Sequence, residues 1–424
     1  MLDSIGKNCY TTNSLLDQQT NKDLMMTHKP TADQLLVRKL NTSLILNTLR
    51  LNSPISRAEL AKNTGLNRST VSSIVAELID GQLIQETELQ KDRVGRPGMS
   101  LEINPDGGAV IGVEIGVNFI QVLLTDFVAQ TLWQARVNMA HPIDQEEFLT
   151  QVEALIAQGA QFALERRVRV LGIGLGVPGL VNISSGELVY APNLKWHNIP
   201  FRQRWHDRFR LPVFVENEAN AAAMGEYYFG VAQQIPDFIF LSLGVGLGGG
   251  IMLEGKLFRG SGGFAGEIGH MQIDPAGELC ACGRRGCWET KVSPTAVIEK
   301  YLSKSPASEN LSGFDTDKFW NIVEEAEHGN QLALNILTEL GRDLGTGASN
   351  LVNIFNPSLI VLGGALIAPG ELLLPEMANT IQSAALKQPR NQVQLSLSDL
   401  GNQACALGAV ALVLDYVMKQ PFVL

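Results

Sequence analysis

The sequence lacks the long apolar runs that membrane and secreted proteins need. No stretch of about 18 consecutive apolar residues occurs, and the first thirty residues have neither the basic start nor the apolar stretch of a signal peptide. Charged residues are also few, at 18% against 45% hydrophobic residues, which excludes a disordered or fibrous chain. We therefore expect a globular cytoplasmic protein with no membrane partner.

Cysteine is scarce as well. The five cysteines in 424 residues do not indicate a disulfide framework in a cytoplasmic protein. Three of them, Cys280, Cys282 and Cys287, lie within eight residues, which indicates a metal site. We interpret Cys9 as a thiol of the N-terminal tail and Cys405 as a small buried hydrophobic residue.

The net charge of −10 excludes a protein that coats nucleic acid over its whole surface, but this charge is unevenly distributed. Residues 33–102 carry nine basic and eight acidic residues, and the first 32 residues carry three of each. The acidic excess therefore belongs to the remainder of the chain. A nearly neutral head can still bind DNA if its few arginines face phosphates, so the charge permits DNA binding without proving it.

The length predicts two or three domains. Residues 1–32 show no sustained hydrophobic period and are rich in Asn, Gln, Thr and Asp, which predicts a flexible leader. We place a first domain at residues 33–104 and a second at residues 105–424.

The first domain begins with helical signals. Leu40, Leu44, Ile45 and Leu49 fall on one helical stripe, which predicts a first helix. The segment 56–59, Ser-Arg-Ala-Glu, has the pattern of a capping box and predicts the start of a second helix.

A short turn then leads into a third helix. Gly65 suits the left-handed conformation that follows a helix end, and Asn67 is a favourable cap for the next helix. That third helix has the i, i+3, i+4, i+7 stripe of a core-facing helix, formed by Val71, Ile74, Val75 and Leu78.

This pair of helices has the form of a helix-turn-helix, in which the second helix enters the major groove. The side opposite the stripe offers Arg68, Ser69, Ser72 and Ser73 as candidate DNA-binding residues. An ordinary helical hairpin used for packing is the alternative, and capping and periodicity alone do not exclude it.

Two short strands follow at once, 83–86 and 100–103, and predict a hairpin wing. At its tip Arg93 and Arg96 lie beside Gly95 and Pro97, which suits contact with phosphates or a minor groove. A merely soluble hairpin is the alternative for this segment. Together the helices and the wing favour a winged helix-turn-helix that binds double-stranded DNA.

The sequence of the second domain predicts an α/β fold. Apolar strands that end in glycine turns are predicted at 110–115, 170–177, 238–243 and 359–362, with helical stretches between them. This alternation predicts a parallel or mixed sheet flanked by helices.

Six motifs, taken together, make the chain resemble the transcriptional-repressor branch of the ROK family (repressors, open reading frames, kinases) over about residues 33–412. Each glycine motif alone would be weak, because glycine turns end strands in most α/β folds. The motifs are Gly95-Arg96-Pro97 of the wing, the segments 174–179, 216–220 and 244–250, Glu267-Ile268-Gly269-His270, and the segment 280–289. The resemblance implies an N-terminal winged helix-turn-helix followed by a two-lobed actin-like sugar-kinase domain of the ribonuclease H-like type.

The metal motif is the strongest single signal. His270, Cys280, Cys282 and Cys287 offer one imidazole and three thiolates, a donor set that matches tetrahedral structural zinc, and the family uses these positions so. With four protein ligands the Zn²⁺ would have no open position, so it would brace the loop. Three unligated buried thiols beside a core histidine are the alternative.

The resemblance also implies a sugar site between the two lobes. Carboxylates and an amide are natural partners for the hydroxyls of a monosaccharide, although each acidic residue taken alone could equally be a solvated surface residue. His270 would bind zinc through one ring nitrogen and sugar through the other. The implied sugar-binding residues are Asn193, Asn217, Glu218, Glu267, His270 and Glu289.

Three positions depart from the kinases of the family. Glu218 stands where the kinases carry the aspartate base, and one extra methylene can displace a carboxylate by about an ångström. The first phosphate turn has Glu114 and Asn118 instead of aspartate and threonine, and Val245 replaces a threonine in the second. Since phosphoryl transfer depends on positioning and charge stabilisation, we expect no enzyme activity and no ATP cofactor.

The sequence therefore predicts a DNA-binding transcription repressor that responds to a sugar and acts as a homodimer or a dimer of dimers. The segment 216–220, Glu-Asn-Glu-Ala-Asn, looks most like the xylose-operon repressors within the family, which favours xylose or a related aldose. The alternatives are a bifunctional sugar kinase with a DNA-binding head, and a sensor whose head contacts only proteins.

Overall fold

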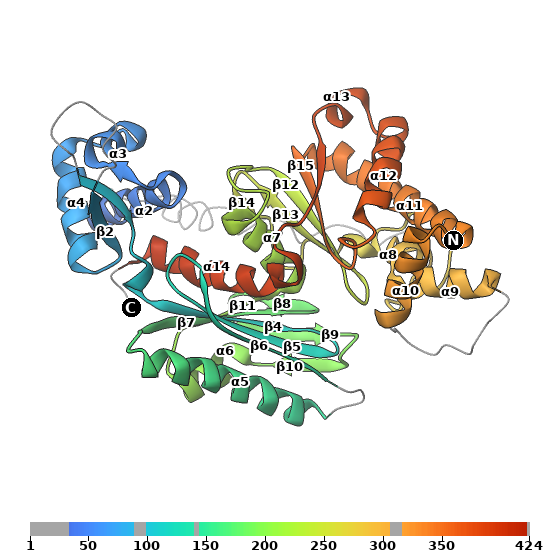
Figure 1. The fold of residues 1–424 in the computed structure, drawn as a ribbon, viewed down its shortest axis with the longest axis horizontal. Coiled ribbons are helices and arrows are strands. Elements are labelled where there is room, and N and C mark those ends of the chain that lie inside the picture. The colour runs from blue at the N-terminus through green and yellow to red at the C-terminus, as the bar shows by residue number, and fades with distance from the viewer. Residues whose placement is uncertain (1–33, 89–98, 140–143, 306–315, 422–424) are drawn as a thin grey trace, which may run out of the picture.

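The computed structural model describes residues 34–88, 99–139, 144–305 and 316–421 (Figure 1). A helical head lies at one end of the molecule, and two lobes, each built on a five-stranded sheet, form the rest. The chain thus has the predicted α/β class with an N-terminal helix-turn-helix.

The head contains three helices and a small sheet. The helices are α2 (Gln34–Asn52), α3 (Arg57–Thr64) and α4 (Arg68–Asp80). The sheet has the order β1-β3-β2, in which β1 (Ile55–Ser56) and β2 (Ile84–Glu88) both pair antiparallel with β3 (Met99–Ile103). The described parts of the hairpin confirm the two strands of the predicted wing.

Local signals determine where the helices of the head begin and end. Ser56 and Glu59 form both bonds of the capping box at the start of α3, and Gly65 ends that helix with φ of 70°. The Asn67 side chain caps α4 by accepting from the amide of Thr70. All four residues of the predicted α4 stripe are buried: Val71, Ile74, Val75 and Leu78.

The first helix is confirmed, but its predicted stripe is only half right. Ile45 and Leu49 are buried, whereas Leu40 and Leu44 are exposed and Leu46 lies in the core instead. The predicted stripe was based on helical spacing alone, whereas the buried face of α2 depends on the elements that pack against it.

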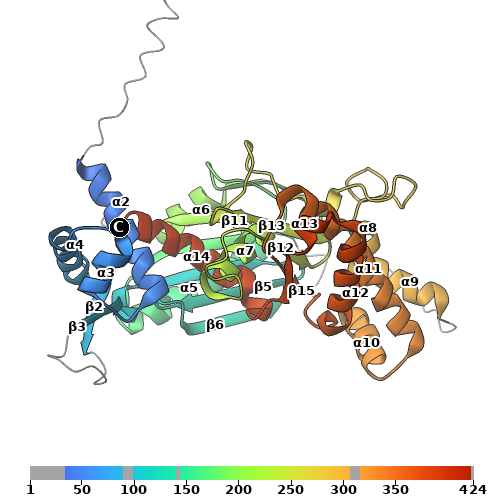
Figure 2. The same ribbon diagram turned by 90° about the horizontal axis from the view of Figure 1, so that it is seen from above.

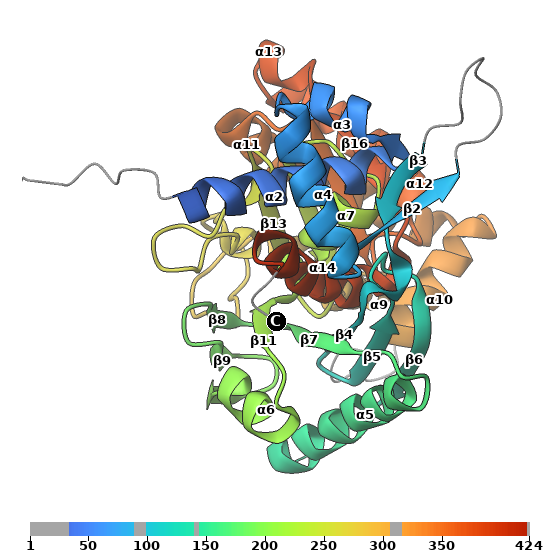
Figure 3. The same cartoon turned by 90° about the vertical axis from the view of Figure 1, so that its left-hand side faces the viewer.

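The first lobe has the strand order β11-β7-β4-β5-β6, with β4, β7 and β11 parallel (Figure 3). Helices α5 (Gln145–Glu165) and α6 (Phe201–Phe209) cover one face of this sheet. The strands are β4 (Ala109–Ile115), β5 (Phe119–Thr125), β6 (Thr131–Asn138), β7 (Val170–Val177) and β11 (Val213–Asn217), with β8 (Leu180–Asn182), β9 (Glu187–Ala191) and β10 (Trp196–Ile199) in a separate antiparallel sheet.

The second lobe has the order β14-β13-β12-β15-β16, in which β12, β15 and β16 are parallel. Its strands are β12 (Phe238–Leu243), β13 (Leu247–Leu253), β14 (Lys256–Leu257), β15 (Leu359–Gly364) and β16 (Gln394–Leu397). Its helices are α8 (Glu289–Val292), α9 (Pro294–Lys304), α10 (Thr316–Glu327), α11 (Gln331–Phe355), α12 (Gly370–Ala384) and α13 (Lys387–Arg390). All four strands predicted for the body are present, with bounds within two residues of the prediction.

Two helices, α7 (Glu218–Phe229) and α14 (Ala404–Lys419), pack between the two sheets. Glycines bring their backbones together: a Cβ on Gly408 of α14 would lie 1.7 Å from the Ala221 carbonyl oxygen, and one on Gly225 of α7 would lie 2.5 Å from the Ala404 carbonyl oxygen. On its other side α14 lies against the first sheet, where a Cβ on Gly174 would lie 1.9 Å from the Ala409 carbonyl oxygen. Only glycine permits contacts this close.

The stretch Gly401–Lys419, which contains α14, is long and apolar enough to cross a membrane, but 67% of it is buried inside the protein. Its apolar residues therefore have a partner within the chain, as expected for the core helix that α14 is. Cys405 is among these buried residues, as predicted.

Candidate functional site

The predicted sugar residues Asn217 and Glu218 lie where β11 ends and α7 begins. The Asn217 side-chain oxygen caps α7 by accepting from the amides of Ala219 and Asn220, at 2.9 and 3.2 Å. Its side-chain nitrogen donates to a Glu218 carboxylate oxygen at 2.6 Å and to the Gly179 carbonyl at 3.2 Å. Asn217 therefore holds Glu218 at the carboxyl edge of the first sheet, the edge where open α/β sheets bind ligands.

Glu218 faces the second lobe. A Cβ on Gly248 of β13 would lie 3.8 Å from a Glu218 carboxylate oxygen, so the glycine lets the second lobe approach this side chain. Burial, together with the nearby charges of Glu267 and Glu114, raises the pKa of Glu218 to about 8. At neutral pH this carboxyl group is mainly protonated and can donate as well as accept a hydrogen bond.

His270 lies between the predicted sugar residues and the cysteines. Its Nε2 is 4.0 Å from a Glu267 carboxylate oxygen, whereas its Nδ1 is 3.6 Å from the Cys280 sulfur and 3.3 Å from Glu289 Oε1. Nε2 thus faces Glu267, whereas Nδ1 faces both Cys280 and Glu289.

The four predicted metal ligands converge. The donor atoms of His270, Cys280, Cys282 and Cys287 all lie within 4.8 Å of one another. Although burial opposes it, hydrogen bonds from Arg284 and from the two neighbouring thiols lower the pKa of Cys282 to about 6, which favours the thiolate that metals bind. Burial raises the pKa of Cys280 and of Cys287, so these two thiols stay protonated until an ion displaces the proton. Three sulfurs and one imidazole nitrogen in one cluster fit a metal ion of the zinc type.

Glu289 lies beside the cysteine cluster. Its Oε1 is 2.8 Å from the Cys280 sulfur, and its Oε2 would be 2.7 Å from a Cβ on Gly246. Glu289 therefore lies between the cysteines and the glycine segment 244–250 of the second lobe.

Asn193 is the one predicted sugar residue that the structure does not tie to the others. It is exposed between β9 and β10, and among the described residues no hydrogen bond connects it to Asn217, Glu218 or Glu267. Asn217 contacts Glu218, and His270 contacts both Glu267 and Glu289. Between these two groups the structure shows only the charge of Glu267, which helps to raise the pKa of Glu218.

Two further features near these residues were not predicted. Glu114 has a buried carboxylate oxygen with no hydrogen-bond partner in the structure, and burial, opposed by the charge of Arg136, raises its pKa to about 7. Glu216, buried on β11, accepts from Arg259 beyond β14 at 2.8 Å and so links the two lobes. The sequence signals for the second feature are an acidic residue at the end of an apolar strand and its place in the family segment 216–220.

In the head, the four residues of α4 that are predicted to bind DNA are all exposed: Arg68, Ser69, Ser72 and Ser73. Ser73 also accepts a hydrogen bond at 3.1 Å from Arg38 of α2, which in turn forms an ion pair with Glu77. Arg38, which the sequence reading missed, therefore braces α4 from the first helix. The predicted wing residues Arg93 and Arg96 lie outside the described residues.

The family model of the ROK family matches residues 110–416, and the model of a winged helix-turn-helix DNA-binding domain matches residues 40–85. The first of these matches covers well over half of the chain. The chain therefore belongs to the ROK family and carries a winged helix-turn-helix at its N-terminal end.

Curated relatives match over nearly the whole chain. A xylose repressor of Caldicellulosiruptor bescii is 36% identical over 391 residues, which cover 91% of this chain and 98% of the relative. The DNA-binding transcriptional dual regulator NagC of Escherichia coli is 31% identical over 382 residues, which cover 89% of this chain and 93% of the relative.

Solved structures agree with this assignment. A ROK-family transcriptional regulator, described as a homologue of the Escherichia coli MLC protein, has a TM-score of 0.78 at 30% identity and covers 90% of this chain and 97% of its own. A ROK glucokinase from Streptomyces griseus, in complex with glucose and AMPPNP, has a TM-score of 0.64 at 33% identity. It covers 72% of this chain and 99% of its own. The body is therefore sugar-kinase-like, and the regulator shares the arrangement of nearly the whole chain.

We expect Glu218 to make the stability of the protein depend on pH. Because folding raises its pKa from 4.5 to about 8, its contribution to stability is fully present below about pH 4.5 and is lost as the pH rises through 8. Glu218→Gln keeps a neutral side chain, so at pH 8.5 this variant should be more stable than wild type by on the order of 2–4 kcal/mol, whereas at pH 5 the difference should be under about 1 kcal/mol. Denaturant unfolding at both pH values measures this difference.

The matched control is Glu165→Gln at the exposed end of α5. Its difference in unfolding free energy from wild type should be the same at both pH values. If the difference between Glu218→Gln and wild type were also the same at both pH values, the role of burial at Glu218 would be contradicted.

Proposed function

We propose that this protein is a DNA-binding transcription repressor of carbohydrate-metabolism genes, controlled by a monosaccharide that binds between the two lobes. The observation that carries the proposal is the presence in one chain of a winged helix-turn-helix and a kinase-like body in which Glu267 lies beside His270 and its charge acts on Glu218. The named repressors among the relatives support the same combination.

We further infer the finer assignments. The sugar is xylose or a related aldose, since a relative at 36% identity is named a xylose repressor. Residues 33–104 form the DNA-binding domain, residues 105–424 form the sugar-sensing domain, and the protein works in the cytoplasm. It acts as a homodimer or a dimer of dimers, because two recognition helices must reach half-sites about 34 Å apart, or a multiple of that distance.

In this proposal the head binds DNA through four residues of α4, which are Arg68, Ser69, Ser72 and Ser73. The wing adds Arg93 and Arg96. The sugar contacts are assigned to Asn193, Asn217, Glu218, Glu267, His270 and Glu289. Asn193 depends on the family resemblance alone, because no described contact ties it to the others.

The metal in this proposal is a structural Zn²⁺ held by His270, Cys280, Cys282 and Cys287. Four protein ligands leave no open position, so the ion braces the loop between η2 (Ile268–His270) and α8 and takes no part in a reaction. The imidazole of His270 belongs to both sites, so the ion also orients a group that faces the sugar.

We expect purified protein to contain about one zinc ion per chain, and Cys282→Ser to lose most of it together with sugar binding. A structural metal contributes its binding energy to folding, and its loss frees the loop that carries His270. Elemental analysis and calorimetric titration with sugar measure the two effects. Cys405→Ser, a buried cysteine outside the cluster, is the matched control and should keep its zinc. Full sugar affinity in metal-free wild type would contradict the bracing role.

We also propose that the body does not phosphorylate its sugar. Glu218 takes the position of the catalytic aspartate, and Glu114, Asn118 and Val245 alter the two phosphate turns relative to the kinases that this body resembles. The expected result in a coupled ADP assay with magnesium-ATP and a responsive sugar is turnover no higher than without sugar. Steady sugar-dependent ADP release at ordinary kinase rates, which are about 1–100 per second, would support the bifunctional kinase instead.

The repressor function is tested by operator binding with and without sugar. A thermal-shift screen of monosaccharides first identifies the sugar, since a specific ligand stabilises the fold by RT ln(1 + [L]/Kd). We expect wild type to bind promoter DNA beside its own gene with an affinity that this sugar changes at least fivefold. Glu218→Ala and Glu267→Ala should lose this response and keep their DNA affinity without sugar within about threefold.

Glu165→Ala, on the exposed end of α5, is the matched control and should respond like wild type. If either cleft variant still responds at the wild-type sugar concentration, the cleft is not the sensor. If wild type binds no operator at any low salt concentration, the head does not read DNA and the proposal fails.

A further inference from the structure

The DNA-binding head is attached to the body through a cation–π contact. Arg50, near the C-terminal end of α2, places its guanidinium 4.2 Å from the ring centre of Tyr228 on α7 and approaches the Tyr228 carbonyl at 3.5 Å. Figures 1 and 2 show α2 beside the C-terminal part of α14, and the two helices are in contact. Arg50 therefore reaches from the head to the helix that begins in the cleft.

Tyr228 is held firmly on the body side. Its ring is buried, and its hydroxyl donates to Asp415 of α14 at 2.7 Å. The other carboxylate oxygen of Asp415 accepts from Lys419 at 2.6 Å. Burial and the Asp415 charge raise the pKa of Tyr228, so the hydroxyl stays a donor at physiological pH.

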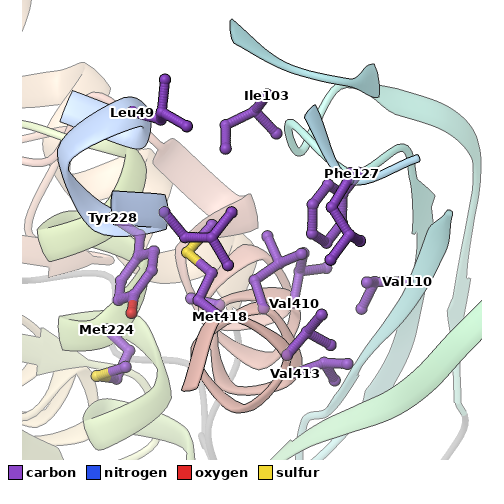
Figure 4. Packing of buried hydrophobic residues seen from close by; sticks show 14 of the residues in the cluster. Leu49, Ile103, Val110, Phe127, Met224, Tyr228, Val410, Val413 and Met418 are labelled. Atoms are coloured by element: carbon purple, nitrogen blue, oxygen red, sulfur yellow. The ribbon is translucent and has the colours of Figure 1, made fainter. Parts of the chain in front are cut away.

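The head and the body also share an apolar core at this place. Figure 4 shows Leu49 of α2 and Ile103 of β3 facing the same packed region as Tyr228, Val410 and Met418. The head is thus packed against α7 and α14 in the described structure and is not carried on a free tether.

Helix α7 connects this contact to the cleft. Glu218 begins the helix and Tyr228 lies ten residues later, about 15 Å along its axis. Nine of its twelve residues are buried, and its backbone touches that of α14 at Gly225 and Gly408, so α7 has little freedom to bend. A displacement at Glu218 therefore reaches Tyr228.

A second attachment holds the head to the first lobe. The turn η1 (Pro105–Gly107) follows β3, and the amide of Phe127 in the first lobe donates to the Pro105 carbonyl at 3.1 Å. On the head side, the Asn104 side chain donates to the Gln82 carbonyl at 2.7 Å. The head is therefore held at three places, on the first lobe, on α14 and on α7. A movement of α7 relative to the first lobe would change the contact at Tyr228 while the attachment at Pro105 stays, and so would tilt the head.

We propose that the contact of Arg50 with Tyr228 transmits sugar binding from the cleft to the DNA-binding head. This inference rests on the proposed function and adds the route of its regulation. Arg50 is a positioning residue in this scheme, because it touches neither sugar nor DNA. Only a difference in contacts between the sugar-bound and sugar-free states can shift the head. Because Arg50 of α2 contacts Tyr228 of α7, a change in the position of α7 changes the contacts of α2.

The experiment uses the full-length protein and measures two quantities for each variant: sugar affinity by calorimetry, and the ratio of operator Kd with and without the sugar found by the thermal screen. Arg50→Met keeps an unbranched side chain over the ring and removes the charge. We expect its sugar affinity to stay within twofold of wild type and its Kd ratio to fall from at least fivefold to under twofold.

Conservative variants separate this role from simple destabilisation. Arg50→Lys keeps a cation over the ring, and Tyr228→Phe keeps the ring and loses only the hydrogen bond to Asp415, so both should retain most of the response. Tyr228→Leu removes the ring and should lose the response as Arg50→Met does. Arg57→Met is the matched control, since Arg57 pairs with Glu86 inside the head, and its Kd ratio should equal that of wild type.

The outcomes distinguish the two proposals. A wild-type ratio near one would overturn the proposed function and the inference with it. A responsive wild type together with a fully responsive Arg50→Met and Tyr228→Leu would overturn the inference alone. Loss of the sugar response in the Arg57→Met control as well would show that any disturbance of the head abolishes the response. That outcome would also overturn the inference.

Discussion

The close backbone packing of α7 on α14 is the contact on which the rest of the molecule depends. A Cβ on Gly408 would lie 1.7 Å from the Ala221 carbonyl oxygen, so a side chain there would force the two helices apart. Helix α14 lies on the first sheet, and α7 touches the second sheet as well as β7 and β11 of the first, so this contact also joins the lobes. Glu218 stands at one end of α7 and the DNA-binding head rests on the other.

The electrostatics of the cleft follow from this packing. The packing leaves Glu114 and Glu218 half-buried, and this burial raises the pKa of Glu114 to about 7 and that of Glu218 to about 8. One Glu114 oxygen has no hydrogen-bond partner. Acids held in this way cost stability and are typical of functional sites. A polyol that donates and accepts hydrogen bonds is the type of ligand that would offset the cost.

The features that could be predicted from the sequence are those set by neighbours along the chain. The capping box of Ser56 and Glu59, the left-handed Gly65 and the cap at Asn67 each depend on a few adjacent residues, and all three are present. The convergence of the cysteines could be predicted from their spacing for the same reason, because Cys280, Cys282 and Cys287 lie on one loop and His270 precedes that loop.

The features that the sequence did not reveal depend on pairs that are far apart in the chain. Leu40 and Leu44 have helical spacing, but which face of α2 is covered is decided by α3 and β3 of the head together with α14, which lies more than 350 residues later. Arg38 with Glu77, Arg259 with Glu216, and Arg50 with Tyr228 join elements in the same way. An arginine on a helix surface gives no signal of its partner in a single sequence, because the same residue suits solvent equally well.

The position of His270 explains why a metal that never touches the sugar could still control its binding. Nδ1 faces the cysteines and Nε2 faces Glu267, so an ion bound at Nδ1 would fix both the tautomer and the orientation of the ring. In the proposed function, loss of the ion would free a ring that must present Nε2 in one direction. Sugar affinity would then fall although every sugar-facing residue is still present, and the signal along α7 would be lost at its source.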